Sequence, residues 1–346
     1  MKLRGIWLTN VDSQVFHSRE KIIEAMGFLI ETGFNVVFPV VWNRGFTLYP
    51  SQLMATTFGR EINPVYEGRD PLGEVITAAK GVGLKVIPWF EYGFVSAYKQ
   101  NGGFLLSKKP EWRATDRKGS LLVKNGFAWM NALDEEVQNF LLALVLEVVK
   151  NYDVDGIQGD DRMPAFPSEG GYDGKTIARY RQQFSCHPPQ NHKHQKWLQW
   201  RADILTNFLA RLYREVKAVK PNVLVSMTPS FYKWGFNEYL QDYPTWMQRK
   251  IVDIIHPQLY RRDFCSYKTI AQQLAKQQLT GNHLSKVFPG ILIKVGSYRI
   301  SEDYLLAAIA YNRFLGIQGE VLFFYEGLRE NDDALAKVLR KYVYFK

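Results

Sequence analysis

The chain has 346 residues, of which 46% are hydrophobic and 14% aromatic, so it can bury a full core and is long enough for one barrel or two smaller domains. The 44 Lys and Arg against 34 Asp and Glu give a formal net charge of +10, but the basic residues are dispersed in runs too short for a nucleic-acid-binding stripe. The composition therefore indicates a globular protein and argues against nucleic acid as a partner.

Strand and helix signals alternate along the first half of the chain. Strands are predicted at 4–11, 34–42 and 84–94, and helices at 17–33, from Pro71 onward and behind Asp134, which is expected to be an N-cap. Two long loops, 44–70 and 98–131, carry aromatic side chains that either build the walls of a cleft or pack into the core. These aromatic residues are Tyr49, Phe58, Trp112 and Trp129.

The second half repeats the alternation. A fourth strand at 154–161 precedes an insertion and a helix at 196–220. Further strands are predicted at 222–230, 253–260, 286–294 and 319–328, and the last three are followed by helices near 268–280, 301–316 and 332–343. Eight such units require a parallel sheet, and in a chain of this length they fit a closed barrel better than an open sheet. We therefore predict an α/β fold, a single (β/α)8 TIM barrel domain covering residues 1–346 with long βα loops.

Nothing in the sequence calls for a cofactor or metal. There is no GxGxxG or GxxxxGKS loop for a nucleotide, and Cys186 and Cys265 form neither a disulfide framework nor a CxxC site. The histidines of CHPPQNHKH, residues 186–194, lack an acidic residue or second cysteine at ligand spacing, which favours a solvated loop. We expect no metal and no cofactor.

The N-terminal stretch MKLRGIWLTN runs from a basic start directly into a strand signal, without the apolar segment and cleavage site of a signal peptide. No apolar run reaches the ~18 residues of a membrane span. As written, the chain is expected to be cytoplasmic, although a chain trimmed of an export signal would look the same. The sequence gives no indication of the oligomeric state.

Polar and aromatic side chains follow several predicted strands, at the end where barrels of this type hold their chemistry. Side-chain alternation places Gln158 and Asp160 on the inner side of strand four, and His256, Gln258 and Tyr260 on the inner side of strand six. Polar groups in such positions need partners, because an unpaired one costs about 1–3 kcal/mol. Some of these residues have a purely structural alternative: Asp161 can pair with Arg162, and Trp42 and Trp89 can belong to the core.

Four stretches carry a resemblance to a known family. RGIWLTNVDS, DVDGIQGDD, HPQLY and GEVLFFYEGL occur in this order between Arg4 and Leu328 and resemble glycosyl-hydrolase-like family 10, also called domain of unknown function 187. The resemblance implies a TIM barrel that acts on carbohydrate. The second stretch is also similar to the DGFRxD strand of the alpha-amylase superfamily, whose last aspartate is the nucleophile. That role would fall on Asp160, whereas Gln158 stands where an arginine is usual.

Glycoside hydrolysis needs one protonated and one ionised carboxyl group, with flat aromatic surfaces to hold the sugar. We predict a glycosidase for an oligo- or polysaccharide, with peptidoglycan-type glycans among the candidates. Asp160 is the expected nucleophile or base, and the general acid is expected to be Glu91, Glu326 or Asp161. The expected substrate-binding residues are Asn10, Asp12, Trp42, Trp89, Gln158, Arg162, Trp234, Gln258, Tyr260 and Tyr325.

Two alternatives remain open. The same aromatic residues could serve a carbohydrate-binding barrel without catalysis. A metal-dependent hydrolase could instead use Asp160, Asp161 and His256.

Overall fold

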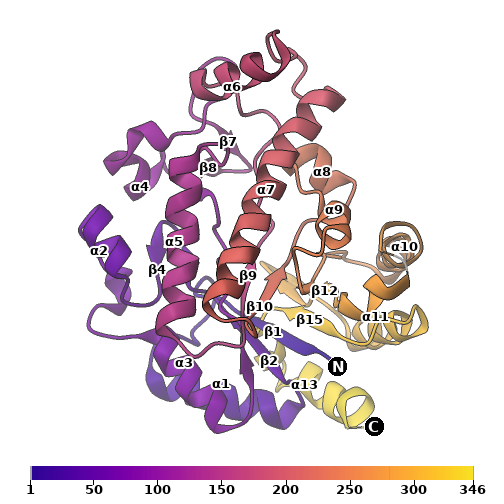
Figure 1. The fold of residues 1–346 in the computed structure, drawn as a ribbon. Helices are drawn as coiled ribbons and strands as arrows, with labels where there is room; N and C mark the ends of the chain where they lie inside the picture. The colour runs from indigo at the N-terminus through magenta and orange to yellow at the C-terminus, as the bar shows by residue number, and fades with distance from the viewer. Residues whose placement is uncertain (1, 280, 346) are drawn as a thin grey trace.

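The parallel strands of the chain form two sheets in the computed structural model, which describes residues 2–279 and 281–345 (Figure 1). All neighbouring strands in both sheets run parallel. The first sheet has the order β12 (Gly290–Leu292), β15 (Glu320–Phe323), β1 (Arg4–Leu8), β2 (Val36–Pro39), β5 (Lys85–Val86). The second has the order β11 (Ile254–Ile255), β10 (Leu224–Met227), β9 (Gly156–Gly159).

Isolated parallel bridges connect the two sheets. Trp89, a short distance beyond β5, pairs with Gln158 in β9. At the opposite edges, Gln258, just beyond β11, pairs with Gly290 in β12. Main-chain pairing therefore passes from one sheet to the other at both edges.

The helices begin and end at the local signals expected of them. The side chain of Ser18 caps α1 (Arg19–Thr32), which ends at Gly33 with a φ of 99°. Asp134 accepts a hydrogen bond from the backbone N–H of Glu136 and so caps α5 (Glu135–Asn151), as predicted. The helix predicted at 268–280 corresponds to α10 (Phe264–Gln273) and a π-helical turn, Leu274–Gln278; position 280 lies outside the described residues.

The remaining helices include two that run side by side across the front of Figure 1, α5 and the long α7 (Gln195–Val219). The others are α2 (Gln52–Phe58), α3 (Pro71–Gly81), α4 (Gly103–Lys108), α6 (Gly174–Phe184), α8 (Trp234–Tyr239), α9 (Tyr243–Gln248), α11 (Glu302–Phe314), α12 (Glu326–Arg329) and α13 (Ala334–Leu339). Short 3₁₀ segments occur at Pro64–Tyr66, Pro110–Trp112 and Gly281–Lys286, and a second π-helical turn at Arg340–Tyr344.

The two long loops contain short antiparallel sheets and pack into the core. The four aromatic residues singled out there, Tyr49, Phe58, Trp112 and Trp129, are at most 5% exposed. Phe58 contacts both Trp112 and Phe140 of α5, with ring centroids 5.7 and 5.5 Å apart. Of the two alternatives for these four residues, core packing is therefore the correct one, and they do not form the walls of a cleft. The short sheets are β3 (Trp42–Asn43) with β4 (Phe46–Thr47), β6 (Val95–Tyr98) with β8 (Phe127–Trp129) and β7 (Val123–Lys124), and, in a later loop, β13 (Lys294–Val295) with β14 (Tyr298–Arg299).

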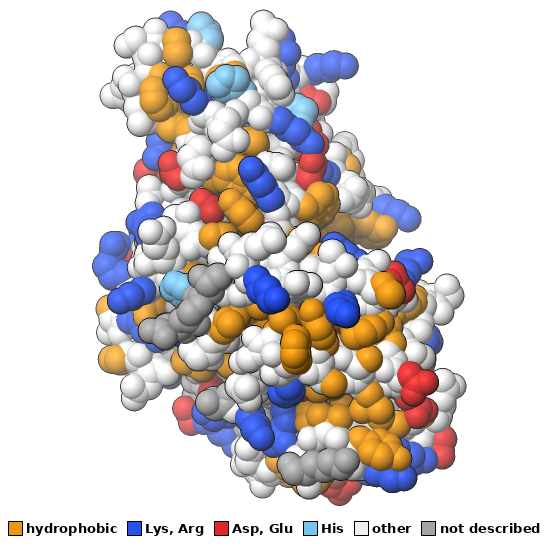
Figure 2. All heavy atoms as spheres, turned by 90° about the vertical axis from the view of Figure 1, so that its right-hand side faces the viewer, with side chains coloured by type: hydrophobic (Ala, Val, Ile, Leu, Met, Phe, Trp, Pro, Cys, Tyr) orange, Lys and Arg blue, Asp and Glu red, His pale blue; other side chains and the backbone are white. Residues whose placement is uncertain are grey.

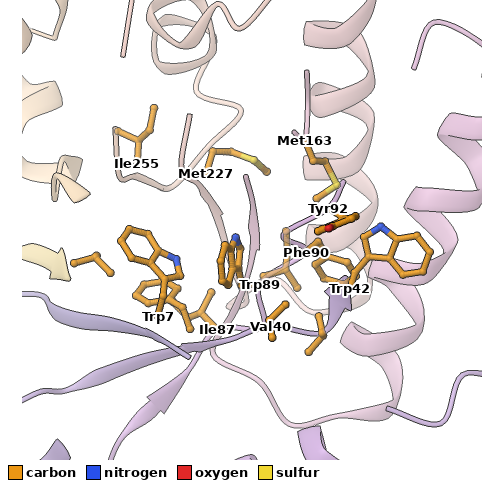
Figure 3. Packing of buried hydrophobic residues seen from close by; sticks show 14 of the residues in the cluster. Trp7, Val40, Trp42, Ile87, Trp89, Phe90, Tyr92, Met163, Met227 and Ile255 are labelled. Atoms are coloured by element: carbon orange, nitrogen blue, oxygen red, sulfur yellow. The ribbon is translucent and has the colours of Figure 1, made fainter. Parts of the chain in front are cut away.

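The inner faces of the parallel strands meet in an aromatic core. Trp7 and Trp89 lie side by side there, with ring centroids 6.2 Å apart (Figure 3). The indole N–H of Trp7 donates to the side-chain oxygen of Gln158 at 2.6 Å, and Gln158 in turn donates to Ser226 at 3.0 Å. The inward orientation predicted for Gln158 is thus confirmed, and its polar groups are satisfied within the core.

The surface carries a dispersed positive charge. On the face shown in Figure 2, Lys and Arg side chains are scattered among acidic, polar and hydrophobic ones and form no continuous stripe. Across residues 2–279 and 281–345, none of the helices has both the length and the apolar character needed to cross a membrane.

Candidate active site

Asp160 directly follows β9 and is 1% exposed. Its Oδ2 accepts hydrogen bonds from the indole N–H of Trp89 at 3.0 Å and from Nη2 of Arg162 at 2.9 Å. Its Oδ1 accepts from the backbone N–H of Asp161 at 2.5 Å and from the side-chain amide of Gln258 at 3.1 Å. Four N–H donors around one carboxyl group favour its ionised form.

Arg162 binds two further carboxyl groups. Its Nη2 lies 3.4 Å from Oε1 of Glu91, and its Nε lies 3.5 Å from Oδ1 of Asp161. Nε also donates to the backbone carbonyl of Glu91 at 2.9 Å. One guanidinium group therefore serves three carboxyl groups, those of Asp160, Asp161 and Glu91.

Burial and mutual repulsion oppose the ionisation of this cluster. Burial raises the pKa of Asp160 well above its usual range and Asp161 adds to this effect, whereas Arg162 lowers it. Burial also raises the pKa of Glu91, against the opposing effects of Arg162 and of a hydrogen bond from Asn43. Such opposed influences are the condition under which neighbouring carboxyl groups hold different charges at one pH.

A cavity of about 400 Å³ opens beside this cluster. Gln258 lines it and also binds Asp160, so that Asp160 lies directly behind the cavity wall. Trp234, at the start of α8, is 53% exposed and offers an aromatic surface at the same cavity. The lining residues lie in the segments that follow the carboxyl ends of β9, β10 and β11: Asp161, Ser230, Phe231, Trp234, Gln258, Tyr260 and Arg261.

Glu326 and Tyr325 lie in a different place from the Asp160 cluster. Glu326 accepts hydrogen bonds from the hydroxyl of Ser13 at 2.6 Å and from the backbone N–H of Gln14 at 2.9 Å. Both Tyr325 and Glu326 line a separate cavity of about 180 Å³. The structure therefore does not bring Glu326 to Asp160 as a partner carboxyl group.

Two other predicted binding residues also lack contact with the cluster. Asp12 forms an ion pair with Lys294, and Asn10 lies against Tyr66. Neither lines the cavity beside Asp160.

Trp42, Trp89 and Gln158 are at most 2% exposed and so present no face to a sugar. The indole N–H of Trp42 donates to the carbonyl of Gly93 at 3.0 Å. All three therefore belong to the core and not to a sugar-binding surface, and Trp89 instead holds Asp160. Figure 3 shows Trp42 and Trp89 among the packed core residues.

Arg261 and Lys294 were not among the substrate-binding residues named from the sequence. Arg261 lines the cavity, and the Nζ of Lys294 lies 4.9 Å from the ring centroid of Phe324 and pairs with Asp12. The available signal was their position, because each ends or directly follows a predicted strand. A basic residue at the carboxyl end of a parallel strand is a candidate for the site in the same way as an acidic one.

His256 is separated from the carboxyl cluster. Its ring packs against Trp7 and Phe38, and its Nδ1 lies 2.9 Å from the carbonyl oxygen of Phe288. Within the part of the chain that the structure describes, no three or more His, Cys, Asp or Glu side chains are arranged to hold a metal. The set of Asp160, Asp161 and His256 is therefore not assembled as ligands.

The fold matches those of solved glycoside hydrolases. The glycoside hydrolase domain of PgaB (BpsB) from Bordetella bronchiseptica superposes with a TM-score of 0.70 at 13% identity, over 97% of this chain and 98% of that one. Alpha-L-fucosidase isoenzyme 2 from Paenibacillus thiaminolyticus gives 0.71 at 18% identity, over the whole of this chain and 49% of that one. The chain therefore has the mixed α/β, TIM-barrel-like fold of glycoside hydrolases.

The family is shown by sequence. The model of the family described as glycosyl hydrolase-like 10 matches residues 2–308, and the chain belongs to this family. Glycosyl hydrolase DigH of Escherichia coli strain K12 is 25% identical over 302 residues, which cover 75% of this chain and 65% of DigH. Glycosyl hydrolase YngK of Bacillus subtilis is 21% identical over 296 residues, covering 75% of this chain and 54% of YngK. The matches thus span less than two thirds of either relative.

Proposed function

We propose that this chain is a glycoside hydrolase that cleaves an oligo- or polysaccharide through the carboxyl groups gathered around Arg162. The observation that carries the proposal is the shared nitrogen: Nη2 of Arg162 lies 2.9 Å from Asp160 and 3.4 Å from Glu91. Membership of a glycosyl hydrolase-like family supports the same reaction class.

The spacing of the two carboxyl groups suits this chemistry. Because both bind one nitrogen, their nearest oxygens cannot be further apart than the sum of those two distances. The ~5–5.5 Å that separates the carboxyl groups of retaining glycosidases lies within this limit on the nearest oxygens. We therefore propose retention, with Asp160 as the nucleophile.

The general acid is Glu91 or Asp161. Burial raises the pKa of both Glu91 and Asp160. Asp160 has four N–H donors and the shorter contact to Arg162, so Glu91 is the one better suited to hold a proton near neutral pH. Asp161 lines the cavity directly and is the more exposed of the two. Activated aryl glycosides separate them, since their leaving group needs no proton. Of the two variants Glu91→Gln and Asp161→Asn, only the one that lacks the general acid should still cleave activated aryl glycosides while it no longer cleaves oligosaccharides.

We further propose that the strands close into a single (β/α)8 barrel domain. The parallel bridges from Trp89 to Gln158 and from Gln258 to Gly290 support closure, because they join the two sheets at both edges. In such a barrel the carboxyl ends of the strands form one face, where the cavity beside Asp160 would lie.

A carbohydrate-binding barrel without catalysis is the second candidate. The observation in its favour is the burial of Asp160, whose 1% exposure leaves little contact with a bound sugar until the cavity wall at Gln258 moves.

Screening the purified chain against a panel of oligosaccharides, including glycan strands of peptidoglycan, tests the proposal. We expect shortened products for at least one glycan, with the same yield in the presence of a chelator. Binding without any cleavage would support the second candidate, and loss of cleavage with chelator would support a metal-dependent reaction.

A further inference from the structure

We propose that Arg162 is the positioning residue of the site, and that it supplies from the loop after β9 the cation that similar strands supply from within the strand. This inference rests on the proposed glycosidase function. In the DGFRxD pattern the arginine lies two residues before the nucleophile, where this chain has Gln158. Arg162 lies two residues after it instead.

Position 158 does not supply that cation in this chain. Gln158 is fully buried, and its amide is used in hydrogen bonds to Trp7 and Ser226. It makes no hydrogen bond to Asp160 among the contacts of the described residues. Gln158, at the position of that arginine, thus belongs to the core, and the carboxylate depends on another residue for its cation.

Arg162 supplies this cation, and contacts with its neighbours fix the position of its side chain. Its backbone carbonyl accepts a hydrogen bond from Phe94 at 3.0 Å, and a Cβ built on Gly93 would lie 2.2 Å from the same oxygen. Its guanidinium carbon lies 5.5 and 5.0 Å from the ring centroids of Tyr92 and Phe127. Contacts on the backbone and on both aromatic rings therefore hold the side chain in place, so that little reorganisation is needed during reaction.

Arg162 is the only cationic side chain that binds Asp160 within residues 2–279 and 281–345. The other three donors to Asp160 are neutral N–H groups of Trp89, Asp161 and Gln258. A cation within ~4–6 Å lowers the pKa of a carboxyl group by ~1–3 pH units, an effect that neutral donors match only in part. Without Arg162, Asp160 would take up a proton at a higher pH.

The other titratable groups that face the cluster do not change charge in the same pH range. Burial raises the pKa of Tyr92, Tyr239 and Tyr260, so these phenols stay neutral at and below neutral pH. Arg44 also faces Glu91. Proton uptake by the cluster in the acidic range therefore takes place on its carboxyl groups.

The test follows the titration of Asp160 directly and needs no substrate. Carbon-13 labelled aspartate gives carboxyl signals in NMR, and the Asp160 signal is the one that is missing in Asp160→Asn. We expect Arg162→Gln to move its midpoint upward by about one pH unit or more, and Arg162→Lys, which keeps the charge, to move it less. Arg214→Gln, which removes an exposed arginine from α7, should leave it unchanged.

Activity gives a second readout once a substrate is known. The acidic limb of the kcat/KM profile should move to higher pH in Arg162→Gln, and kcat/KM at neutral pH should fall by about 100-fold or more. In Arg162→Lys, the acidic limb should move less and kcat/KM at neutral pH should fall less than in Arg162→Gln. The inference would be overturned if the Asp160 midpoint stayed unchanged in folded Arg162→Gln and Arg162→Lys. It would also be overturned if kcat/KM decreased in Arg162→Gln while the acidic limb of its pH profile stayed at the same pH. If Asp160 shifts as expected and no glycan is cleaved by the wild type, the charge role stands and the glycosidase proposal fails.

Discussion

The indole N–H of Trp89 donates a 3.0 Å hydrogen bond to Oδ2 of Asp160. The two residues lie at the ends of adjacent strands, and the parallel bridge between Trp89 and Gln158 fixes their relative register. Because the indole is 2% exposed, its polar group serves Asp160 and not solvent or a sugar. An aromatic residue at a strand end thus orients a carboxylate, together with Arg162 on the same oxygen.

Replacing Trp89 by Phe tests this hydrogen bond, since it removes the donor and keeps an aromatic ring. A hydrogen bond to a charged group contributes ~1.5–3 kcal/mol, so we expect kcat/KM to fall by about 10- to 100-fold. The control is Trp246→Phe, which removes a buried indole hydrogen bond to Thr206 at 3.1 Å, away from the cavity. Equal kcat/KM values for the two variants would show that the Trp89 bond has no role in the reaction.

Trp234 should bind sugar without contributing to folding. It is 53% exposed at the cavity, where stacking on a pyranose would hold the substrate in the ground state and the transition state alike. We expect Trp234→Ala to raise KM by about 10-fold, with kcat and the unfolding temperature little changed. Phe314→Ala, at a more exposed aromatic residue outside this cavity, is the matched control. An unchanged KM would remove Trp234 from the binding surface.

Glu91 should make the folded chain less stable as the pH rises. Burial raises its pKa, so between its ordinary value and the raised one the folded protein keeps a proton that the unfolded chain has released. The free energy of unfolding therefore decreases as pH increases through that window, by ~1.4 kcal/mol for each pH unit of the shift.

Urea unfolding midpoints at several pH values check this. Glu91→Gln should flatten the decrease and be more stable than the wild type at neutral pH. Glu67→Gln, at an exposed glutamate outside the Arg162 cluster, is the matched control. A Glu91→Gln variant that is less stable at every pH would mean that Glu91 is held by favourable contacts as an ion.

Arg201 anchors the insertion between β9 and α7. This fully buried guanidinium donates to the backbone carbonyls of Ser168 and Gly170, both at 2.6 Å, and to that of His192 at 2.7 Å. Arg201→Met would leave these carbonyl groups without a partner, and each costs ~1–3 kcal/mol. We expect the free energy of unfolding to fall by at least about 3 kcal/mol in urea titrations.

Arg214→Met removes an exposed arginine from the same helix and should cost less than about 0.5 kcal/mol. If both variants unfolded at the same urea concentration, the insertion would not depend on Arg201.

The order of elements could be predicted from local signals, because these signals act within a few residues. Gly33 ends α1 with a positive φ, and Asp134 caps α5, both at the expected positions. The inward orientation of Gln158 followed from side-chain alternation alone. The six-residue helices α8 and α9 could not be predicted in the same way, since they are too short to show a periodic pattern and depend on packing.

The site was only partly predictable, because a position at the end of a strand does not give the direction of the side chain. Trp89 and Trp234 both lie near the carboxyl end of a predicted strand, yet Trp89 is buried against Asp160 and Trp234 lines the cavity. Glu326 follows β15 as Asp160 follows β9, but it begins the short helix α12 and turns to Ser13. These outcomes depend on contacts between residues far apart in the chain, which no local pattern contains.

The turnover of Asp160→Asn on an oligosaccharide that the wild type cleaves tests the proposed role of Asp160 most directly. Asn keeps the shape of the side chain and removes its charge, and circular dichroism would show that the fold is intact. We expect kcat to fall by several orders of magnitude while the glycan still binds. Full activity in Asp160→Asn would contradict the role given to the carboxyl groups around Arg162.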